Sequence, residues 1–242
     1  MFKKLLAILL IILVLPLMAN ATPILVGPGD LTGSRSTPPA SGVVTYDGWT
    51  VENGGFKISW SISQNPITLI WSYSYTFTNA DGTLINPDMS HLLLEVSPFI
   101  TADNFAQYIF NANASLVAPQ LWIPGGDGNS NPNLPANIYG IKLNTGSGLV
   151  NGTYTFESTQ RPVWGDFYTK DGKHDSIIAT AWNTGFGTDP TTTDFTNWIP
   201  TPDTDTTGTN SPIPEPGTLL LLGFGLVGLA GYARIRIGRK DK

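Results

Sequence analysis

The sequence has 242 residues with no cysteine, 41% hydrophobic residues and only 13% charged residues, which is enough for one substantial domain but not for two large ones. Disulfide bonds are therefore excluded. Two of the 13 basic residues lie in the N-terminal segment, and five basic residues and one acidic residue lie in the C-terminal one. Residues 22–216 therefore hold six basic and 17 acidic residues, a net charge of −11. So acidic a body argues against nucleic acid as a partner.

The first 21 residues have the three parts of a secretory signal peptide. Two lysines form a short positive end, residues 5–17 are an apolar run, and Ala19-Asn20-Ala21 matches the A-x-A cleavage pattern. Cleavage there would make Thr22 the first residue of the mature chain. The alternative is an uncleaved anchor, but the apolar run is short for a span of about 20 residues. We therefore predict a secreted protein with a signal peptide at residues 1–21.

Two segments alternate strictly between apolar and polar residues, which places the two kinds of side chain on opposite faces of a β-strand. Residues 56–63 read FKISWSIS and residues 71–78 read WSYSYTFT. Such strands are half buried, as in antiparallel sheets with one face in water. Between them, Asn65-Pro66 interrupts the pattern because proline fixes φ and lacks a backbone N–H donor. We expect the two strands to form a hairpin.

Further short segments have the character of β-strands, and Asp-Gly or Asn-Gly dipeptides of the kind that tight turns require separate several of them. These strands are expected at residues 43–52, 91–97, 138–144, 153–158, 163–170 and 176–183. Only residues 101–110 are predicted as a helix, capped by Thr101 or Asp103. Many short strands and almost no helix predict an all-β fold, an antiparallel β-sandwich of the jelly-roll kind. The strand order does not follow from the pattern.

Two segments are too rich in glycine, proline and polar residues for regular structure. Residues 118–137 are predicted as a long surface loop, and we expect Trp122 within it to be exposed, as a candidate flat contact for a sugar ring. From residue 199 the sequence IPTPDTDTTGTNSPI has low complexity and is stiffened by proline. We therefore predict one β-sandwich domain over residues 22–198, followed by a spacer over residues 199–213.

Catalytic and metal-binding patterns are weak in the body of the chain. The two histidines, at positions 91 and 174, are far apart, and no G-x-S-x-G motif accompanies either, so a zinc site and a Ser-His-Asp triad are not predicted. Aspartates gather in two loops, and Ca²⁺ accepts such oxygen ligands, although their spacing does not match the EF-hand loop. These residues are Asp166, Asp171, Asp175, Asp189 and Asp194. Apart from this calcium hypothesis, no cofactor is predicted.

The C-terminal segment combines a Pro-Glu-Pro sequence, an apolar run and a basic end. No charged residue occurs from Gly217 to Ala233, and a helix of that length is about 25 Å long, at the lower limit for crossing a membrane. The basic residues that follow should stay in the cytoplasm by the positive-inside rule. A buried core helix is the alternative, but such helices are seldom followed by a cluster of cations. We predict a single C-terminal transmembrane helix.

This tail resembles the PEP-CTERM sorting signal of exported bacterial proteins. The resemblance rests on the apolar helix, on the motif residues Pro214, Glu215 and Pro216, and on the basic cluster of Arg234, Arg236 and Arg239. It implies that an exosortase-type protease recognises residues 214–242 and cuts near the motif, while the tail transiently anchors the chain in the inner membrane of a Gram-negative-type bacterium. The released domain is then expected at the cell surface or in the exopolysaccharide matrix of a biofilm.

Three short segments of the body, SHLLLEVS, NIYGIKL and RPVWGDFYTKDGK, also resemble a recurrent body type among PEP-CTERM proteins of unassigned function. This second resemblance implies one β domain and no particular activity.

Three functional hypotheses remain open. The first is a non-enzymatic surface or matrix protein with a structural or adhesive role. The second is a carbohydrate-binding module that holds extracellular polysaccharide through aromatic residues such as Trp122. The third is a hydrolase of matrix polymer, which needs two carboxylates about 5 to 9.5 Å apart. Fold class alone does not choose among them, and we favour the first hypothesis.

Overall fold

A computed structural model of the whole chain describes residues 23–125, 131–144, 152–172, 178–190 and 194–203. These residues fall within one compact unit that spans Pro23–Thr206. The predicted signal peptide with Ala19 and Ala21 lies outside the described residues. So do the motif residues Pro214, Glu215 and Pro216 and the basic cluster of Arg234, Arg236 and Arg239.

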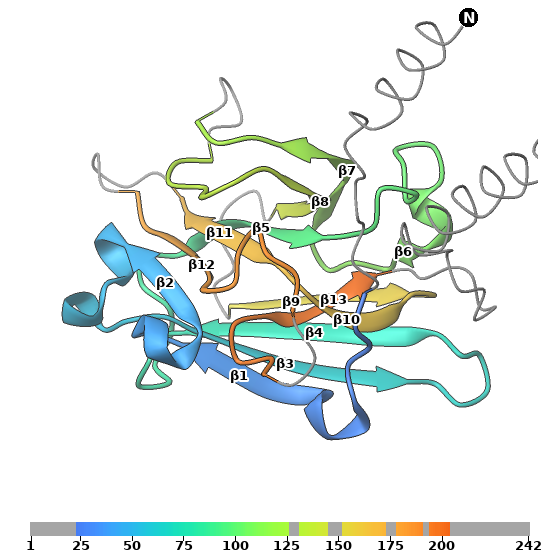
Figure 1. Cartoon of the computed structure of the whole chain (residues 1–242), viewed down its shortest axis with the longest axis horizontal. Coiled ribbons are helices and arrows are strands. Elements are labelled where there is room, and N and C mark those ends of the chain that lie inside the picture. The colour runs from blue at the N-terminus through green and yellow to red at the C-terminus, as the bar shows by residue number, and fades with distance from the viewer. Residues whose placement is uncertain (1–22, 126–130, 145–151, 173–177, 191–193, 204–242) are drawn as a thin grey trace, which may run out of the picture. The chain divides into compact units, whose positions relative to one another are not determined.

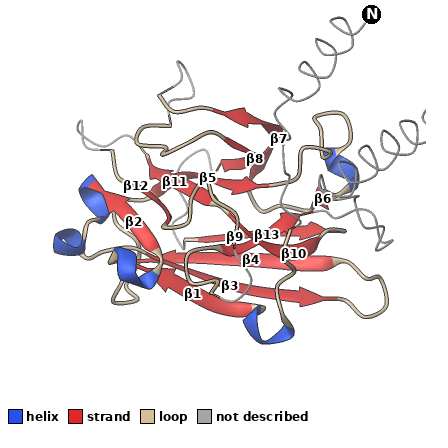
Figure 2. Ribbon diagram, in the orientation of Figure 1, coloured by secondary structure: helices blue, strands red, loops and turns tan. Residues whose placement is uncertain are grey.

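The described part of the chain is all-β, and every pair of neighbouring strands within its sheets is antiparallel. Short 3₁₀ turns are its only helical elements, as Figure 2 shows. They are η1 (Pro28–Asp30), η2 (Pro39–Ser41), η3 (Asp47–Trp49), η4 (Val51–Asn53) and η5 (Phe105–Gln107).

One sheet has five strands in the order β1-β3-β4-β9-β6. Its strands are β1 (Thr32–Ser36), β3 (Lys57–Gln64), β4 (Trp71–Thr78), β6 (Ile109–Phe110) and β9 (Thr153–Ser158). The predicted hairpin is confirmed, because β3 and β4 pair along their whole length. Asn65 shapes its turn: the side-chain Oδ1 accepts hydrogen bonds from the backbone N–H groups of Ile67 and Thr68, at 2.9 and 3.1 Å.

The other large sheet has six strands in the order β2-β12-β11-β5-β8-β7. Its strands are β2 (Val43–Tyr46), β5 (Met89–Glu95), β7 (Ser115–Trp122), β8 (Ile138–Asn144), β11 (Phe167–Asp171) and β12 (Thr180–Asn183). The single strand expected at residues 163–170 divides at Asp166, since residues 161–165 pair in a different sheet.

The two large sheets share one hydrophobic core, to which alternate residues of both contribute. Phe56, just before β3, and Phe167 on β11 meet across it with ring centroids 6.3 Å apart. In Figure 1 the layer of β1, β3 and β4 lies below the layer of β5, β11 and β12. The outer face of the six-stranded sheet carries a second hydrophobic cluster. Because both of its faces are covered, β5 buries three successive leucines instead of alternating.

The predicted domain boundary at residue 198 is wrong, because β13 (Ile199–Asp203) pairs with β10 (Arg161–Gly165) in a two-stranded sheet. The prolines of IPTPD, at positions 200 and 202, lie opposite Trp164 and Pro162 of β10. The backbone N–H of Trp164 donates to the Ile24 carbonyl instead of to β13, and proline is tolerated in an edge strand where its missing N–H is not needed for pairing. Ile199 is fully buried, and the Tyr75 hydroxyl donates to the Pro200 carbonyl at 2.7 Å.

The helix predicted at residues 101–110 is also wrong. Only the 3₁₀ turn η5 forms, and residues 109–110 become strand β6 beside β9. The side chain of Asn104 closes a local turn instead, with Oδ1 accepting from the Thr101 N–H at 2.7 Å and Nδ2 donating to the Phe99 carbonyl at 3.0 Å. Such side-chain bonds to the backbone compete with helix formation.

No helix among the described residues is long and apolar enough to cross a membrane, and the predicted transmembrane helix lies outside them.

Candidate functional site

A row of polar side chains crosses the outer face of the six-stranded sheet. Residues directly opposite each other on neighbouring strands share a face, so the register aligns one residue from each of the six strands. In sheet order these are Tyr46, Thr180, Lys170, His91, Asn144 and Ser115. Neighbouring strands are about 4.8 Å apart, so the row is about 24 Å long.

Lys142 lies two residues along β8 from Asn144, on the same face, opposite Leu93 of β5. Its ammonium nitrogen is 5.2 Å from the ring centroid of Trp122, which is a cation–π contact. We call Lys170, His91 and Lys142 the basic cluster of the outer face.

His91 sits at the centre of the basic cluster and is only 2% exposed. Burial, together with the positive charges of Lys142 and Lys170, lowers the pKa of its imidazole to about 3. The Asn131 side chain lies against His91, and a hydrogen bond between the two has a smaller, opposite effect on this pKa. The imidazole is therefore neutral at pH 7.

Lys142 is in a similar position. It is 7% exposed, and burial lowers its pKa, with a further contribution from Lys170. An ion pair with a carboxylate would have the opposite effect. The cluster thus concentrates positive charge in a body whose net charge is strongly negative.

A well-anchored segment at residues 131–134 lies over the middle of the polar row, whereas Tyr46 at one end is 48% exposed. The Tyr168 hydroxyl donates to the Pro132 carbonyl at 2.6 Å, and Asn133 Nδ2 donates to Thr180 Oγ1 at 3.3 Å. Leu134 is buried in the outer hydrophobic cluster. At the other end, Asn144 is partly exposed and Ser115 is exposed.

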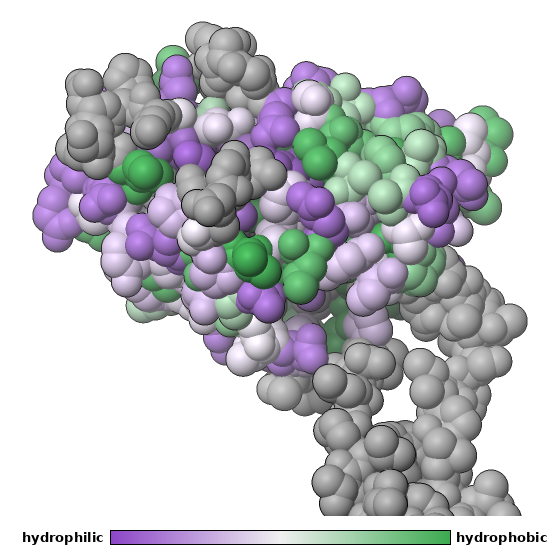
Figure 3. All heavy atoms as spheres, turned by 90° about the horizontal axis from the view of Figure 1, so that it is seen from above, coloured by the Kyte–Doolittle hydropathy of each residue, from purple (hydrophilic) through white to green (hydrophobic). Residues whose placement is uncertain are grey.

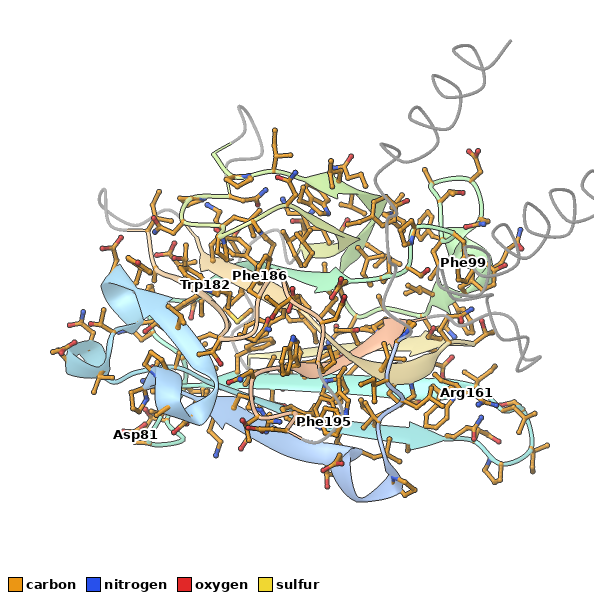
Figure 4. All side chains as sticks on the ribbon, in the orientation of Figure 1. Asp81, Phe99, Arg161, Trp182, Phe186 and Phe195 are labelled. Carbon is orange, nitrogen blue, oxygen red and sulfur yellow. The ribbon has the colours of Figure 1, made fainter. Side chains whose placement is uncertain are left out.

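Aromatic rings line the Tyr46 end of the same face. Trp182 stacks on Tyr46 with centroids 5.3 Å apart, and Phe186 packs against the same cluster. Figure 4 labels Trp182 and Phe186, which lie next to each other in that view. Figure 3 views the molecule from above, on the side where β7 and β8 lie uppermost in Figure 1. Hydrophilic residues cover much of that view, with hydrophobic ones among them.

The prediction that Trp122 is exposed is wrong, because its side chain is 3% exposed. The residue ends strand β7 instead of lying in a loop, and its indole N–H donates to the Gly140 carbonyl at 2.8 Å. The irregular part of the predicted loop begins only after it. Pro119, which made the segment look irregular, lies where the register of β7 shifts between Val117 and Gln120, a position that tolerates proline.

The aspartates proposed as calcium ligands have other roles where they are described. Asp166 is buried; its Oδ1 accepts from Asn183 Nδ2 and its Oδ2 from the Gly187 N–H, both at 2.7 Å. Burial raises its pKa to about 6, and the charge of Asp189 acts in the same direction. Asp194 accepts two hydrogen bonds from Thr196, which lower its pKa.

Asp171 is buried on β11, and Asp175 lies outside the described residues. Within the described ranges no group of three or more acidic or histidine side chains is placed to hold a metal ion. Calcium binding stays a prediction.

Sequence reasoning missed the basic cluster, although a signal was present. Lys142 and His91 stand within otherwise apolar strand segments, IYGIKLN and SHLLLEVS, where a charged or titratable residue is unusual. Single strands do not reveal which residues lie opposite each other, so their convergence could not be seen. The second histidine, His174, lies outside the described residues.

Comparison with known families identifies the tail. Residues 212–236 match the model of the PEP-CTERM protein-sorting motif. The chain therefore carries this sorting signal, which implies export, membrane anchoring at the C-terminus before processing, and recognition by an exosortase. A search of curated proteins found no match to the chain, and neither did a search of solved structures.

Proposed function

We propose that this chain is a non-enzymatic surface protein with a structural or adhesive role, released by an exosortase from a transient anchor in the inner membrane. The observation that carries the proposal is the sorting motif at residues 212–236. The signal-peptide pattern at residues 1–21 supports it, because the body must be exported across the inner membrane before an exosortase can release it. The final location is the cell surface or the extracellular matrix of a Gram-negative-type bacterium.

The body is suited to a role as a stable extracellular module. We interpret its two large sheets, which share one core, as the layers of a β-sandwich; the jelly-roll arrangement stays a prediction. Without cysteine, stability rests on core packing, in which each fully buried large side chain contributes about 1.5–3 kcal/mol. Two tyrosine hydroxyls of β4 bond to the small sheet and to the residue before it: Tyr75 donates to the Pro200 carbonyl of β13, and Tyr73 donates to the Gln160 carbonyl, just before β10.

The hydrolase hypothesis has less support than the structural one. Glu95 and Asp166 are neighbours, since a Glu95 carboxylate oxygen accepts from the backbone N–H of Asp166 at 2.8 Å. Asp166 in turn holds Asn183 and Gly187. These carboxylates accept hydrogen bonds from backbone N–H groups and from the Asn183 side chain, whereas glycoside hydrolysis needs a pair that faces substrate.

The carbohydrate-binding hypothesis loses the exposed Trp122 on which it was based. Polysaccharide binding would have to use another part of the surface.

The test of the sorting proposal is made in the organism that produces the protein. Glu215→Ala, or deletion of residues 214–242, should change the mass or the location of the mature protein, because the protease would lose its recognition motif. Glu52→Ala, an exposed residue of the body, is the matched control and should leave both unchanged. If both tail variants match the wild type in mass and location, the sorting proposal is wrong.

A further inference from the structure

We propose that the turn of the β3–β4 hairpin inserts into the surface of the lipid bilayer in which the C-terminal tail is anchored before processing. Residues 65–71 are called the hairpin tip. This inference goes beyond the proposed function, and it rests on the membrane anchoring that the proposed function requires.

The hairpin tip exposes large apolar side chains. Ile67 is 90% exposed and Leu69 is 62% exposed, and among the described residues no large apolar side chain is more exposed than Ile67. Trp71, which follows, is partly exposed. No charged residue occurs between positions 58 and 80. An exposed apolar patch is typical of a contact with another protein or with a membrane, and burial of this one would remove no charge from water.

The backbone of the hairpin tip is suited to an apolar environment, where unpaired N–H groups are costly. Every backbone N–H group of residues 65–70 donates a hydrogen bond within the tip, and Pro66 has no N–H. Asn65 accepts three of these bonds, two at its side-chain oxygen and one at its carbonyl. The N–H of Asn65 donates to the Ile70 carbonyl at 2.9 Å, and the N–H of Ile70 donates to the Thr68 hydroxyl oxygen at 3.4 Å. The tip can therefore leave water without exposing an unpaired backbone donor.

Leu69 has an unfavourable backbone conformation that core packing does not explain. Its φ is 61°, in the left-handed region that glycine and asparagine adopt more readily than leucine. Because the side chain is 62% exposed, the strain is not offset by burial in the core. Strained positions of this kind point to a functional role. Here the leucine adds apolar surface to the outside of the hairpin tip.

The chain leaves the body at the same end as the hairpin tip. The Tyr73 hydroxyl of β4 donates to the Gln160 carbonyl, and the next residue, Arg161, lies opposite Asp203, the last described residue. In Figure 1 the hairpin turn and the end of β13 lie on the same side of the body. Only residues 204–216 separate Asp203 from the apolar run, and a fully extended chain of this length spans about 50 Å at most. Membrane anchoring therefore keeps the hairpin end of the body close to the bilayer.

A lipid surface fits the hairpin tip better than a second copy of the chain. A stable protein interface buries about 800 Å² on each partner, whereas the tip offers the side chains of one short turn. Arg161, exposed at this end of the body and labelled in Figure 4, can bond to a lipid phosphate group. Insertion of a few apolar side chains beside a basic residue is typical of a contact with the bilayer interface.

The experiment uses the chain after removal of its signal peptide, residues 22–242, in vesicles of phosphatidylethanolamine and phosphatidylglycerol. Because the chain has no cysteine, Ile67→Cys provides a single site for a bimane fluorophore at the hairpin tip. Leu84→Cys is the matched control, since Leu84 is 65% exposed and pairs with Thr78 at the opposite end of β4. We expect lipids with a spin label in the acyl chain to quench the fluorophore at position 67 but not the one at position 84.

A substitution within the tip tests the role of its apolar side chains. Leu69→Asn, made in the Ile67→Cys chain, should lower the ratio of inserted to free tip about tenfold or more, because one leucine is no longer buried in lipid. Asparagine adopts the left-handed conformation, so the turn should be kept. Leu84→Asn in the same Ile67→Cys chain should leave the quenching at position 67 unchanged.

Flotation of the vesicles in alkaline carbonate shows whether the chain is anchored. The inference is overturned if the chain floats with the vesicles but the fluorophore at position 67 is not quenched. Equal quenching at positions 67 and 84 would also overturn it, because the whole body would then lie on the bilayer. Blue-shifted emission at position 67 without quenching by lipid would show that a second copy covers the tip. A chain that does not float contradicts the anchoring itself, and with it both the proposed function and this inference.

Discussion

Removal of strand β13 provides a sharp test of where the folded body ends. We compare a chain of residues 22–206 with one of residues 22–198, which stops before Ile199. The shorter chain loses a fully buried isoleucine, and truncating such a side chain alone to alanine costs about 2–5 kcal/mol. The truncation also removes the Pro200 carbonyl, which accepts a hydrogen bond from the buried Tyr75 hydroxyl. Leaving that hydroxyl without a partner costs about 1–3 kcal/mol more.

The expected loss is therefore at least about 3 kcal/mol, a large part of the 5–15 kcal/mol that stabilises a typical domain. The assay is guanidinium unfolding followed by tryptophan fluorescence, with the free energy of unfolding obtained by linear extrapolation. In the longer chain, Ile199→Ala should cost about 2–5 kcal/mol, whereas Leu84→Ala, at a side chain 65% exposed, should change stability by less than about 0.5 kcal/mol. Equal stability of the two chain lengths would refute the assignment of β13 to the core.

Three further predictions concern single residues of the body. Gly33→Ala should destabilise by about 1–3 kcal/mol, because a Cβ there would lie 2.5 Å from the ring of Trp60; an unchanged melting temperature would contradict this packing. Trp122→Phe should cost about 1–2 kcal/mol by leaving the Gly140 carbonyl without its indole donor, and a neutral effect in urea unfolding would speak against that bond. The pKa of Asp166 is raised to about 6 in the folded state, against about 3.9 in the unfolded state. The contribution of this carboxyl group to the free energy of unfolding should therefore fall by up to about 3 kcal/mol between pH 4 and pH 7.

The sign of the Asp166 effect follows from proton binding. The folded state holds this proton more tightly than the unfolded state, so stability is fully present below the unfolded pKa and is lost as the pH rises through the folded pKa. Asp166→Asn removes the titration, and the difference between the two stability profiles should therefore slope with pH over this window. A constant difference from pH 4 to pH 7 would show that the pKa is not raised.

Several strands could be predicted from the sequence with their observed bounds, and in β4 the reason is strict alternation of apolar and polar residues. Strand β4 was predicted with its observed bounds because each apolar side chain of WSYSYTFT faces the core and each polar one faces away. Strands 138–144 and 153–158 were also predicted with their observed bounds. In these segments local pattern and tertiary environment agree, so no long-range information was needed.

Proline misled the sequence analysis in two places. In IPTPD and in the start of residues 118–137, proline and its polar neighbours indicated irregular chain, yet both segments are strands. Whether proline interrupts a strand depends on which way its missing N–H would point, and that depends on the partner strand. The partner strands β10 and β8 could not be inferred from the segments themselves.

The basic cluster of the outer face could not be predicted for a related reason. His91, Lys142 and Lys170 lie on three strands that are distant in sequence, and only the strand order β11-β5-β8 brings them together. The sorting signal is the opposite case: its motif, apolar run and basic end are contiguous, so the sequence predicted it and the family comparison at residues 212–236 confirmed it.

The central claim, that the ends of the chain direct its location and are removed, is tested most directly by intact mass spectrometry of the mature protein from its own cells, combined with fractionation. We predict a surface or extracellular protein that begins at Thr22 and ends near Pro214–Pro216, without the basic C-terminal cluster. A cell-retained protein whose mass still includes residues 217–242 would contradict the claim.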